Sequence, residues 1–438
     1  MTGLTVVEAR QRLLILYALR WFPVGFLIPV VVLLMIERGL TLGQVGLVAS
    51  VQGLVVLFLE LPTGGLADMV GRRPVLLLAA GVNLLSIVIL VVADEMWMFL
   101  IGLFLQGVFR ALDSGPLDAW YVDTVLAVDP KAHYETGLSA AGVATGIAIA
   151  AGAMVSSGLV GLHPVTAVSA LTNPVLFAVA AQLLSLVAIA VLMVEHRQVS
   201  DLRALGTSLR AVPETITASV RMLRRSRVLL ALIVVELLWG FGSVTFETLI
   251  PPRLAEVVGN PNTAAAILGP AGSAAWVAAA LGAALVPLAT RRLRPQVTAV
   301  VLRVLQGLTV VGMGLLAGPV GVLAAYIGCY VVHGASNPVH LGLLHRQVEG
   351  ANRTTVVSLN AMMAQPAGAA GQVTLTWLAG GAGVGLAMVV GAVALAAAAP
   401  LYLVGARPAS RAAAQPASRP RQLRSFDPVG EVEAVRAP

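Results

Sequence analysis

Charged residues and cysteine are scarce in this chain of 438 residues. Asp, Glu, Lys and Arg together make up 11% of the sequence, whereas an ordinary soluble domain carries about 25%. The single cysteine, Cys329, excludes a framework of intramolecular disulfides. Apolar residues make up 58% of the chain, which is more than a soluble protein of this length could bury. The composition therefore predicts an integral membrane protein.

Twelve apolar segments of the sequence are long enough to cross a bilayer, because a spanning helix needs about 20 mostly apolar residues. They lie at 13–36, 41–63, 74–93, 96–122, 137–161, 166–194, 228–250, 264–289, 296–317, 319–344, 354–378 and 381–404. The sequence therefore predicts an all-α membrane protein with twelve transmembrane helices.

The basic residues are distributed unevenly between the two sides that these helices define. If both termini are cytoplasmic, 23 of the 28 Lys and Arg residues lie in cytoplasmic segments and two lie in outside loops. This asymmetry predicts cytoplasmic termini. It also explains the net charge of +7 by attraction to anionic lipid rather than to nucleic acid. Because arginine outnumbers lysine 27 to 1, which indicates a GC-rich bacterial genome, we expect a multi-pass protein of the bacterial inner (plasma) membrane.

The longest internal loop separates the helices into two groups of six. We expect residues 1–194 and 228–404 to form two six-helix bundles, which is one of the repeat architectures of secondary transporters. Within 195–227, apolar residues at near-helical spacing alternate with arginines and predict an amphipathic helix along the inner membrane surface. Residues 405–438 are rich in Ala, Pro, Ser and Arg, and they predict a disordered cytoplasmic tail.

A short polar stretch, GGLADMVGRRP at 64–74, connects the second and third apolar segments. It fits the pattern G-x-L-A-D-R/K-x-G-R-R/K at Gly64, Leu66, Ala67, Asp68, Gly71, Arg72 and Arg73. Met69 stands where a basic residue is usual. The stretch resembles the cytoplasmic signature of the major facilitator superfamily, and the twelve helices with a long central loop extend the resemblance to nearly the whole chain. The resemblance implies a two-bundle transporter fold with cytoplasmic termini.

The charges of this stretch predict contacts at the cytoplasmic ends of the helices. Asp68 is expected to face the N-terminus of the eleventh helix, where an acid is favourable. Arg72 or Arg73 is expected to pair with an acid at the inner end of the fourth helix, and Asp123 is the best candidate. We interpret the stretch as a cytoplasmic gate that holds the two halves together until the protein opens inward. The alternative is a hydrophilic turn whose arginines only set the topology.

Two further stretches resemble bacterial drug exporters of the tetracycline and macrolide efflux type. They read ELPTGGLAD at 60–68 and HGASNPVHLGLLHRQV at 333–348. Proton-coupled drug exporters often carry G-x-x-x-G-P-x-x-G-G in the fifth helix. Here Gly142 and Gly146 fit that pattern, but Ile147 replaces the proline. The resemblance implies export, whereas the missing proline favours uptake.

Ionisable residues inside a spanning helix cost about 2.5–3.5 kcal/mol each on insertion scales, so each of them is a functional candidate. The segment 96–122 holds Arg110, Asp113 and Asp118, and Pro116 predicts a bend before Asp118. Arg110 and Asp113 are three residues apart and share a helix face. They are either a structural ion pair or a site for proton exchange and substrate binding.

A second group of candidates lies in the seventh and tenth helices. Glu236 lies about 13 Å into its helix and is a candidate for proton or cation binding. Glu247, three turns further on, is expected to be an outer-gate or solvated acid. His333 and Asn337 are expected to share a polar cavity wall with His340. This histidine pair has no further acidic or thiolate ligands at a useful spacing, so no metal site is expected.

Two more arginines lie within predicted helices. Arg20 and Glu60 lie at similar depths in the first and second helices and are expected to form an inner-gate or structural ion pair. Arg303 lies in the ninth helix, which the resemblance places at the periphery of the fold. We expect its long side chain to reach the inner membrane surface.

These features together predict a secondary active transporter that exports an amphipathic drug or metabolite in exchange for protons. Asp113 or Glu236 is expected to carry the proton. No GxxxxGK[ST] stretch is present, so we expect a proton gradient rather than ATP as the energy source, and no cofactor. No catalytic constellation stands out, so we expect no enzymatic activity. The alternatives are proton-coupled uptake of a small metabolite and a non-transporting receptor or scaffold, and we expect a monomer.

Overall fold

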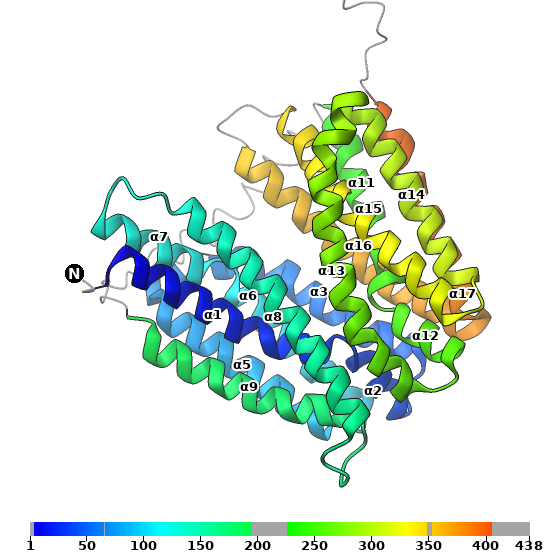
Figure 1. Ribbon diagram of the computed structural model, residues 1–438, viewed down its shortest axis with the longest axis horizontal. Coiled ribbons are helices and arrows are strands. Elements are labelled where there is room, and N and C mark those ends of the chain that lie inside the picture. The colour runs from blue at the N-terminus through cyan, green and yellow to red at the C-terminus, as the bar shows by residue number, and fades with distance from the viewer. Residues whose placement is uncertain (1–3, 65, 195–225, 348–352, 405–438) are drawn as a thin grey trace, which may run out of the picture. The chain divides into compact units, whose positions relative to one another are not determined.

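The computed structural model describes residues 4–64, 66–194, 226–347 and 353–404, and these residues form helices joined by short connections (Figure 1). The first helices along the chain are α1 (Val6–Leu27), α2 (Val31–Glu37), α3 (Leu42–Gly64), α4 (Leu66–Val70), α5 (Arg72–Val92), α6 (Met96–Asp113), α7 (Pro116–Val128), α8 (Glu135–Leu162) and α9 (Thr172–Leu192). They are followed by α11 (Arg227–Glu247), α12 (Ile250–Val258), α13 (Pro261–Arg292), α14 (Pro295–Leu315), α15 (Pro319–His345), α16 (Arg353–Ala382), α17 (Val384–Ala397) and the 3-10 helix η2 (Ala399–Leu403). The tail predicted for 405–438 lies outside the described residues, as does the amphipathic helix predicted for 195–227 except at its last two positions.

Four of the membrane-spanning segments consist of two consecutive pieces. These pieces are α1 with α2, α6 with α7, α11 with α12, and α17 with η2. The break between α6 and α7 lies at Gly115, whose φ of 94° is in the left-handed region that favours glycine. Pro116 then begins α7, where its missing amide hydrogen costs no helical hydrogen bond. The bend predicted from Pro116 is therefore confirmed.

Eleven helical segments of the described chain are long and apolar enough to cross a membrane. They do not include α16, although this helix has 30 residues and lies where the eleventh spanning helix is predicted. Its composition is more polar, and its residues Gln365 and Gln372 line a cavity inside the protein. The all-helical membrane fold predicted from the sequence is confirmed.

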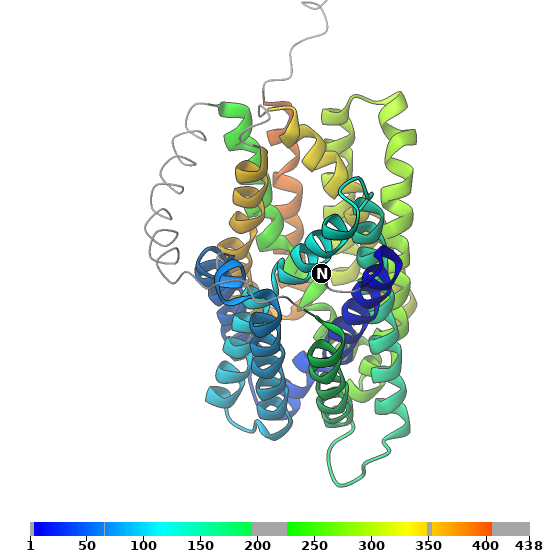
Figure 2. The same ribbon diagram turned by 90° about the vertical axis from the view of Figure 1, so that its left-hand side faces the viewer.

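The helices form two groups, α1 to α9 and α11 to η2, which Figures 1 and 2 show from two directions. In the first group α1 packs against α8 and α9, and in the second α13 and α14 pack against α15. The two groups contact each other mainly through α3 with α16 and through α8 with α13. We call the end at which α1 begins the inner end and the opposite end the outer end. The orientation of these ends in the cell stays a prediction.

Glycine residues allow the helix pairs between the two groups to approach closely. A Cβ atom on Gly46 in α3 would lie 2.1 Å from the backbone oxygen of Gln372 in α16. A Cβ atom on Gly269 in α13 would lie 2.2 Å from the backbone oxygen of Ala153 in α8. A side chain at either position would therefore push the helices apart. The Gly269 amide also donates a hydrogen bond of 2.9 Å to the Ser157 hydroxyl, which links α13 to α8.

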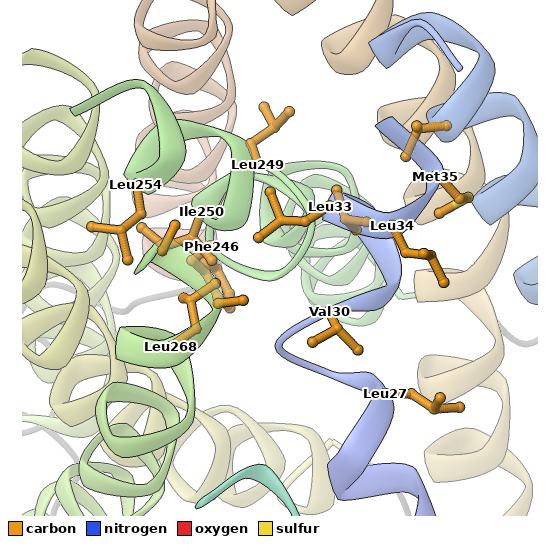
Figure 3. Packing of buried hydrophobic residues seen from close by; sticks show 14 of the residues in the cluster. Leu27, Val30, Leu33, Leu34, Met35, Phe246, Leu249, Ile250, Leu254 and Leu268 are labelled. Carbon is orange, nitrogen blue, oxygen red and sulfur yellow. The ribbon is translucent and has the colours of Figure 1, made fainter. Parts of the chain in front are cut away.

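The buried apolar residues are divided differently at the two ends of the protein. At the outer end one cluster, which we call the shared outer cluster, contains residues of both groups, such as Leu33 of α2 and Leu254 of α12 (Figure 3). At the inner end, Leu16 belongs to a cluster of the first group alone, and Leu343 belongs to a cluster of the second group alone. The two groups are therefore packed together at the outer end and separate at the inner end.

Candidate functional site

A cavity of about 720 Å³ lies between the two groups of helices, and we call it the central cavity. Its lining residues come from α1, α2, α3, α5, α6 and α8 in the first group and from α11, α12, α13, α15 and α16 in the second. On its outer side it is bounded by residues of the shared outer cluster, such as Leu27, Val244 and Leu268. A cavity of this size can enclose a drug-sized molecule, because such pockets measure about 300–1,000 Å³.

Two charged residues line the central cavity in the described part of the chain, Arg110 and Glu247. Arg110 lies in the last turn of α6, and Glu247 is the last residue of α11. Both are exposed, and neither forms an ion pair with another described residue. Arg110 does not pair with Asp113, although the two share a helix face in the sequence. Glu247 lies in the cavity wall rather than at the outer mouth, because the spanning segment continues as far as Val258.

Aromatic side chains form one wall of the central cavity. The ring centroid of Tyr330 in α15 lies 5.0 Å from that of Tyr326, 5.8 Å from that of Phe246 and 6.1 Å from that of Trp276. All three pairs have the edge-to-face arrangement that aromatic rings prefer. The four residues line the cavity, and Phe246 directly precedes Glu247 in the chain. Trp276 is 44% exposed, whereas the other three side chains are buried, so the wall offers aromatic surface mainly through Trp276.

The break between α6 and α7 is attached to α1 by polar contacts. Asp113, the last residue of α6, forms an ion pair with Arg20, and the two side chains are only 10% and 5% exposed. Asp118 of α7 accepts a hydrogen bond of 2.5 Å from the Tyr17 hydroxyl. The Arg20 guanidinium also lies 5.2 Å from the centroid of the Tyr17 ring. Asp113 and Asp118 therefore hold the two sides of the break against α1, and neither lines the central cavity.

The predicted ion pair between Arg20 and Glu60 is wrong. The two residues lie at similar depths in the sequence, but depth does not determine which helices are neighbours. Helix α1 packs against α7, α8 and α9, whereas Glu60 lies in α3. Asp113 lies at the break just before α7, which packs against α1, and Arg20 pairs with it instead of Glu60.

A second cavity, of about 350 Å³, lies within the second group of helices, and we call it the polar cavity. Glu236 lines it, with its carboxylate 3.6 Å from Nε2 of His340. The same nitrogen of His340 lies 3.1 Å from Oδ1 of Asn360, and its Nδ1 lies 2.9 Å from the hydroxyl of Tyr402. The predicted residues His333 and Asn337 line the polar cavity as well, so the structure brings them together with Glu236.

Arg303 of α14 also lines the polar cavity. It is buried, and its Nη1 donates a hydrogen bond of 2.7 Å to Oε1 of Gln306. The expectation that its side chain reaches the membrane surface is therefore wrong, because α14 packs its Arg303 side toward the cavity beside α15. Glu236 is the one acid among the described lining residues, so its charge is balanced by that of Arg303.

One side chain lies between the two cavities. Trp239 of α11 lines both of them, and its ring stacks on that of His333 with centroids 5.6 Å apart. The ring of Phe246, in the wall of the central cavity, lies 5.7 Å from the same histidine. The polar cavity and the central cavity therefore contact each other through a short chain of packed rings.

The stretch GGLADMVGRRP runs from the end of α3 through α4 into α5. Gly64 ends α3, and Gly71 has a φ of 102°, which is in the left-handed region that favours glycine. The side chain of Asp68 lies outside the described residues, so its predicted contact with the eleventh helix stays a prediction.

The two arginines of this stretch contact other helices of the first group. Arg72 forms an ion pair with Asp123 of α7 at 2.5 Å, and this is the partner named from the sequence. Arg73 donates a hydrogen bond of 2.5 Å to the backbone oxygen of Ala190 in α9. Neither of these two contacts joins the two groups of helices in this conformation. The role of the stretch as a gate stays a prediction.

A comparison with protein-family models matches residues 13–372 to the Major Facilitator Superfamily. This chain belongs to the major facilitator superfamily. The match covers most of both groups of helices and confirms the resemblance carried by GGLADMVGRRP. The superfamily and the fold make this protein a membrane transporter rather than an enzyme. A sequence comparison with curated proteins gives no match.

Solved structures of several transporters are similar to this member of the superfamily. The crystal structure of the nucleoside transporter NupG has a TM-score of 0.73 at 12% identity and covers 91% of this chain and 99% of its own. A bacterial homolog of the human lysosomal transporter Spinster, inward-facing and occupied, has a TM-score of 0.72 at 14% identity, with 91% and 96% covered. The peptide transporter POT in complex with sulfate has a TM-score of 0.70 at 15% identity, with 91% and 94% covered. These similarities confirm the fold.

Sequence reasoning did not select Arg303 or Glu247 as site residues. Both carry the signal that selected Arg110 and Glu236, namely an ionisable side chain within a spanning segment. Arg303 was assigned to the periphery from its helix number, and Glu247 to the outer mouth from an end of the seventh helix set at residue 250. The sequence therefore contains the chemical signal for both residues, but the assumed helix positions gave them the wrong locations.

Proposed function

We propose that this protein is a secondary active transporter that exports an amphipathic drug or metabolite in exchange for protons. In such a cycle the central cavity is accessible from one side of the membrane at a time. The observation that carries the proposal is the arrangement of the apolar clusters. One cluster joins the two groups of helices at the outer end, and each group has its own cluster at the inner end. The basic residues predict that the inner end faces the cytoplasm. In a bacterial inner (plasma) membrane the cavity then receives its substrate from the cytoplasm.

The composition of the central cavity supports an amphipathic substrate. Its wall of Phe246, Trp276, Tyr326 and Tyr330 suits an apolar or aromatic body. A sugar needs many hydrogen-bonding partners around its whole surface, whereas most of the described lining residues here are apolar or aromatic. The lining therefore favours an organic molecule with a large apolar part.

We assign the proton to Glu236 rather than to Asp113. Asp113 is neutralised by Arg20 and lies outside the central cavity. Glu236 lies in the polar cavity, which contacts the central cavity through Trp239. Protonation of Glu236 would remove the negative charge that balances Arg303, and a change of this balance can shift the population between two conformations.

A second candidate function is proton-coupled uptake of a small metabolite. Ile147 favours it, because this residue replaces the proline that drug exporters of the superfamily often carry in the fifth helix. The two functions use the same cavities and differ in which side of the membrane loads the substrate.

The proposed function is tested by accumulation of labelled drugs in cells that lack their main efflux pumps. Wild type is compared with Glu236→Gln, with Asp113→Asn and with Glu95→Gln, a control at an exposed acid outside both cavities. We expect wild type and Glu95→Gln to reduce accumulation unless an uncoupler is present, and Glu236→Gln to lose this effect. Higher accumulation in wild type would favour uptake, and no change across a broad panel would contradict drug export.

A further inference from the structure

The two charges of the central cavity indicate the class of its substrate, given the transport function proposed above. We infer that the cavity binds a zwitterion, whose anionic group contacts Arg110, whose ammonium group contacts Glu247, and whose body packs against the aromatic wall. A substrate of this class carries no net charge but holds two opposite charges several ångströms apart.

The first argument is the charge balance of the lining. Among the described residues that line the central cavity, Arg110 is the cation and Glu247 is the anion, and all others are uncharged. A membrane protein places charges at this depth only at a large cost, so a charge that serves no internal ion pair is a functional candidate. Both side chains are exposed, and neither forms an ion pair with a described residue, although the charge of Arg110 acts on Glu247.

The second argument is the position of the two charges on opposite walls of one cavity. Arg110 belongs to the first group of helices and lies 14 residues after Met96, the outer end of α6, or about 21 Å from it. Glu247 belongs to the second group and is the last residue of α11, and the charge of Arg110 acts on it. One molecule between the two groups can therefore contact both charges.

The third argument is the chemistry that surrounds each charge. Gln106 precedes Arg110 by four residues, lies on the same face of α6 and lines the same cavity. A guanidinium with an amide beside it binds a carboxylate or phosphate through several hydrogen bonds. On the other wall, Tyr326 and Tyr330 line the cavity with Glu247, and aromatic faces attract an ammonium group.

Substrates with a single charge fit this cavity less well. A lipophilic cation would contact Glu247 and leave Arg110 without a partner, next to a positively charged ligand. An anion would contact Arg110 and leave Glu247 without a partner, next to a negatively charged ligand. A charge that is buried without a partner is less stable than a charge in water. Each singly charged ligand would bury one such charge of the cavity, whereas a zwitterion would bury none.

A matched series of four ligands on one aromatic body tests the inference. The probes are biphenylalanine, its methyl ester, its N-acetyl derivative and its N-acetyl methyl ester, which are a zwitterion, a cation, an anion and a neutral molecule. Binding to the purified full chain is measured as thermal stabilisation and as a dissociation constant. The variants are Arg110→Gln and Glu247→Gln, with Arg291→Gln and Glu95→Gln as exposed controls outside the cavity.

We expect wild type and both controls to bind biphenylalanine at least about tenfold more tightly than the other three probes, because each charge-assisted contact contributes about that factor. Arg110→Gln should lose this preference and bind the ester best, and Glu247→Gln should bind the N-acetyl derivative best. The opposite shifts in preference separate recognition of charge from a merely structural role, which would weaken all four probes alike.

Equal binding of the four probes, a preference for the ester in wild type, or no binding of any probe would overturn the inference. An equal loss for all four probes in either variant would do the same, because it would indicate that Arg110 and Glu247 support the fold or each other. If the probes fail while uncoupler-sensitive drug export persists, the inference fails and the proposed function stands. If export also fails, both fall.

Discussion

Removal of the Asp113 carboxylate should destabilise the protein strongly, because it leaves the Arg20 charge buried without its partner. Arg20 is 5% exposed and Asp113 is 10% exposed. The loss of one member of a buried ion pair costs about 3–5 kcal/mol. The ion pair of Arg38 and Asp94, which are 22% and 71% exposed, provides a comparison within the same chain. Its loss should cost less than about 1 kcal/mol.

The assay compares the unfolding of purified Asp113→Asn and Asp94→Asn variants in one detergent. We expect a large decrease in the unfolding midpoint for Asp113→Asn and a small decrease for Asp94→Asn. A third variant replaces both partners of the buried pair, Arg20→Met with Asp113→Leu. It should unfold close to wild type, because apolar residues of similar volume can replace a buried ion pair at little cost.

Two results would refute this reasoning. Equal small shifts for Asp113→Asn and Asp94→Asn would indicate that the buried pair contributes no more than an exposed one. A stable Asp113→Asn protein that has lost uncoupler-sensitive transport would assign the proton to Asp113. The contact at the break between α6 and α7 would then be part of the coupling rather than a support for the fold.

Three further changes have expected outcomes. Gly269→Val should separate the outer ends of α8 and α13, because its side chain would meet the Ala153 oxygen at 2.2 Å; spin-label distances between the two helices check this, and unchanged distances would contradict it. Glu236→Gln should bind substrate with an affinity that no longer depends on pH, because the exchangeable proton is gone; titrations at several pH values would expose a remaining dependence. Cys329 is 0% exposed and should react with maleimide much more slowly in the folded than in the unfolded protein.

The positions of the helices could be predicted from the sequence because a bilayer demands long apolar segments. The break beside Gly115 could be predicted as well, because Pro116 cannot continue a helix as other residues do. The partner of Arg20 could not be predicted from the sequence. The sequence gives the depth of a residue along its helix, but the neighbours of that helix depend on packing. Asp113 rather than Glu60 lies near α1, because it precedes the break to α7, which packs against α1.

The candidate site shows the same division between chemistry and packing. Arg110, Glu236 and His333 were selected because polar groups are costly inside a membrane, and all three line cavities. Their distribution over two cavities depends on how α11, α14 and α15 pack, and no sequence spacing encodes it. For the same reason the burial of Arg303 could not be predicted, although its contact with Gln306, three residues later, fits helical spacing.

The shared outer cluster gives the transport cycle a thermodynamic signature. Opening toward the outer side must separate residues such as Leu33 and Leu254 and expose their apolar surface to water. Such exposure increases the heat capacity, and the hydrophobic stabilisation of the closed outer end weakens on cooling. The outward step therefore resembles a small, reversible unfolding of the outer end. Cooling should populate the outward-open form, and the logarithm of the transport rate should be curved against inverse temperature.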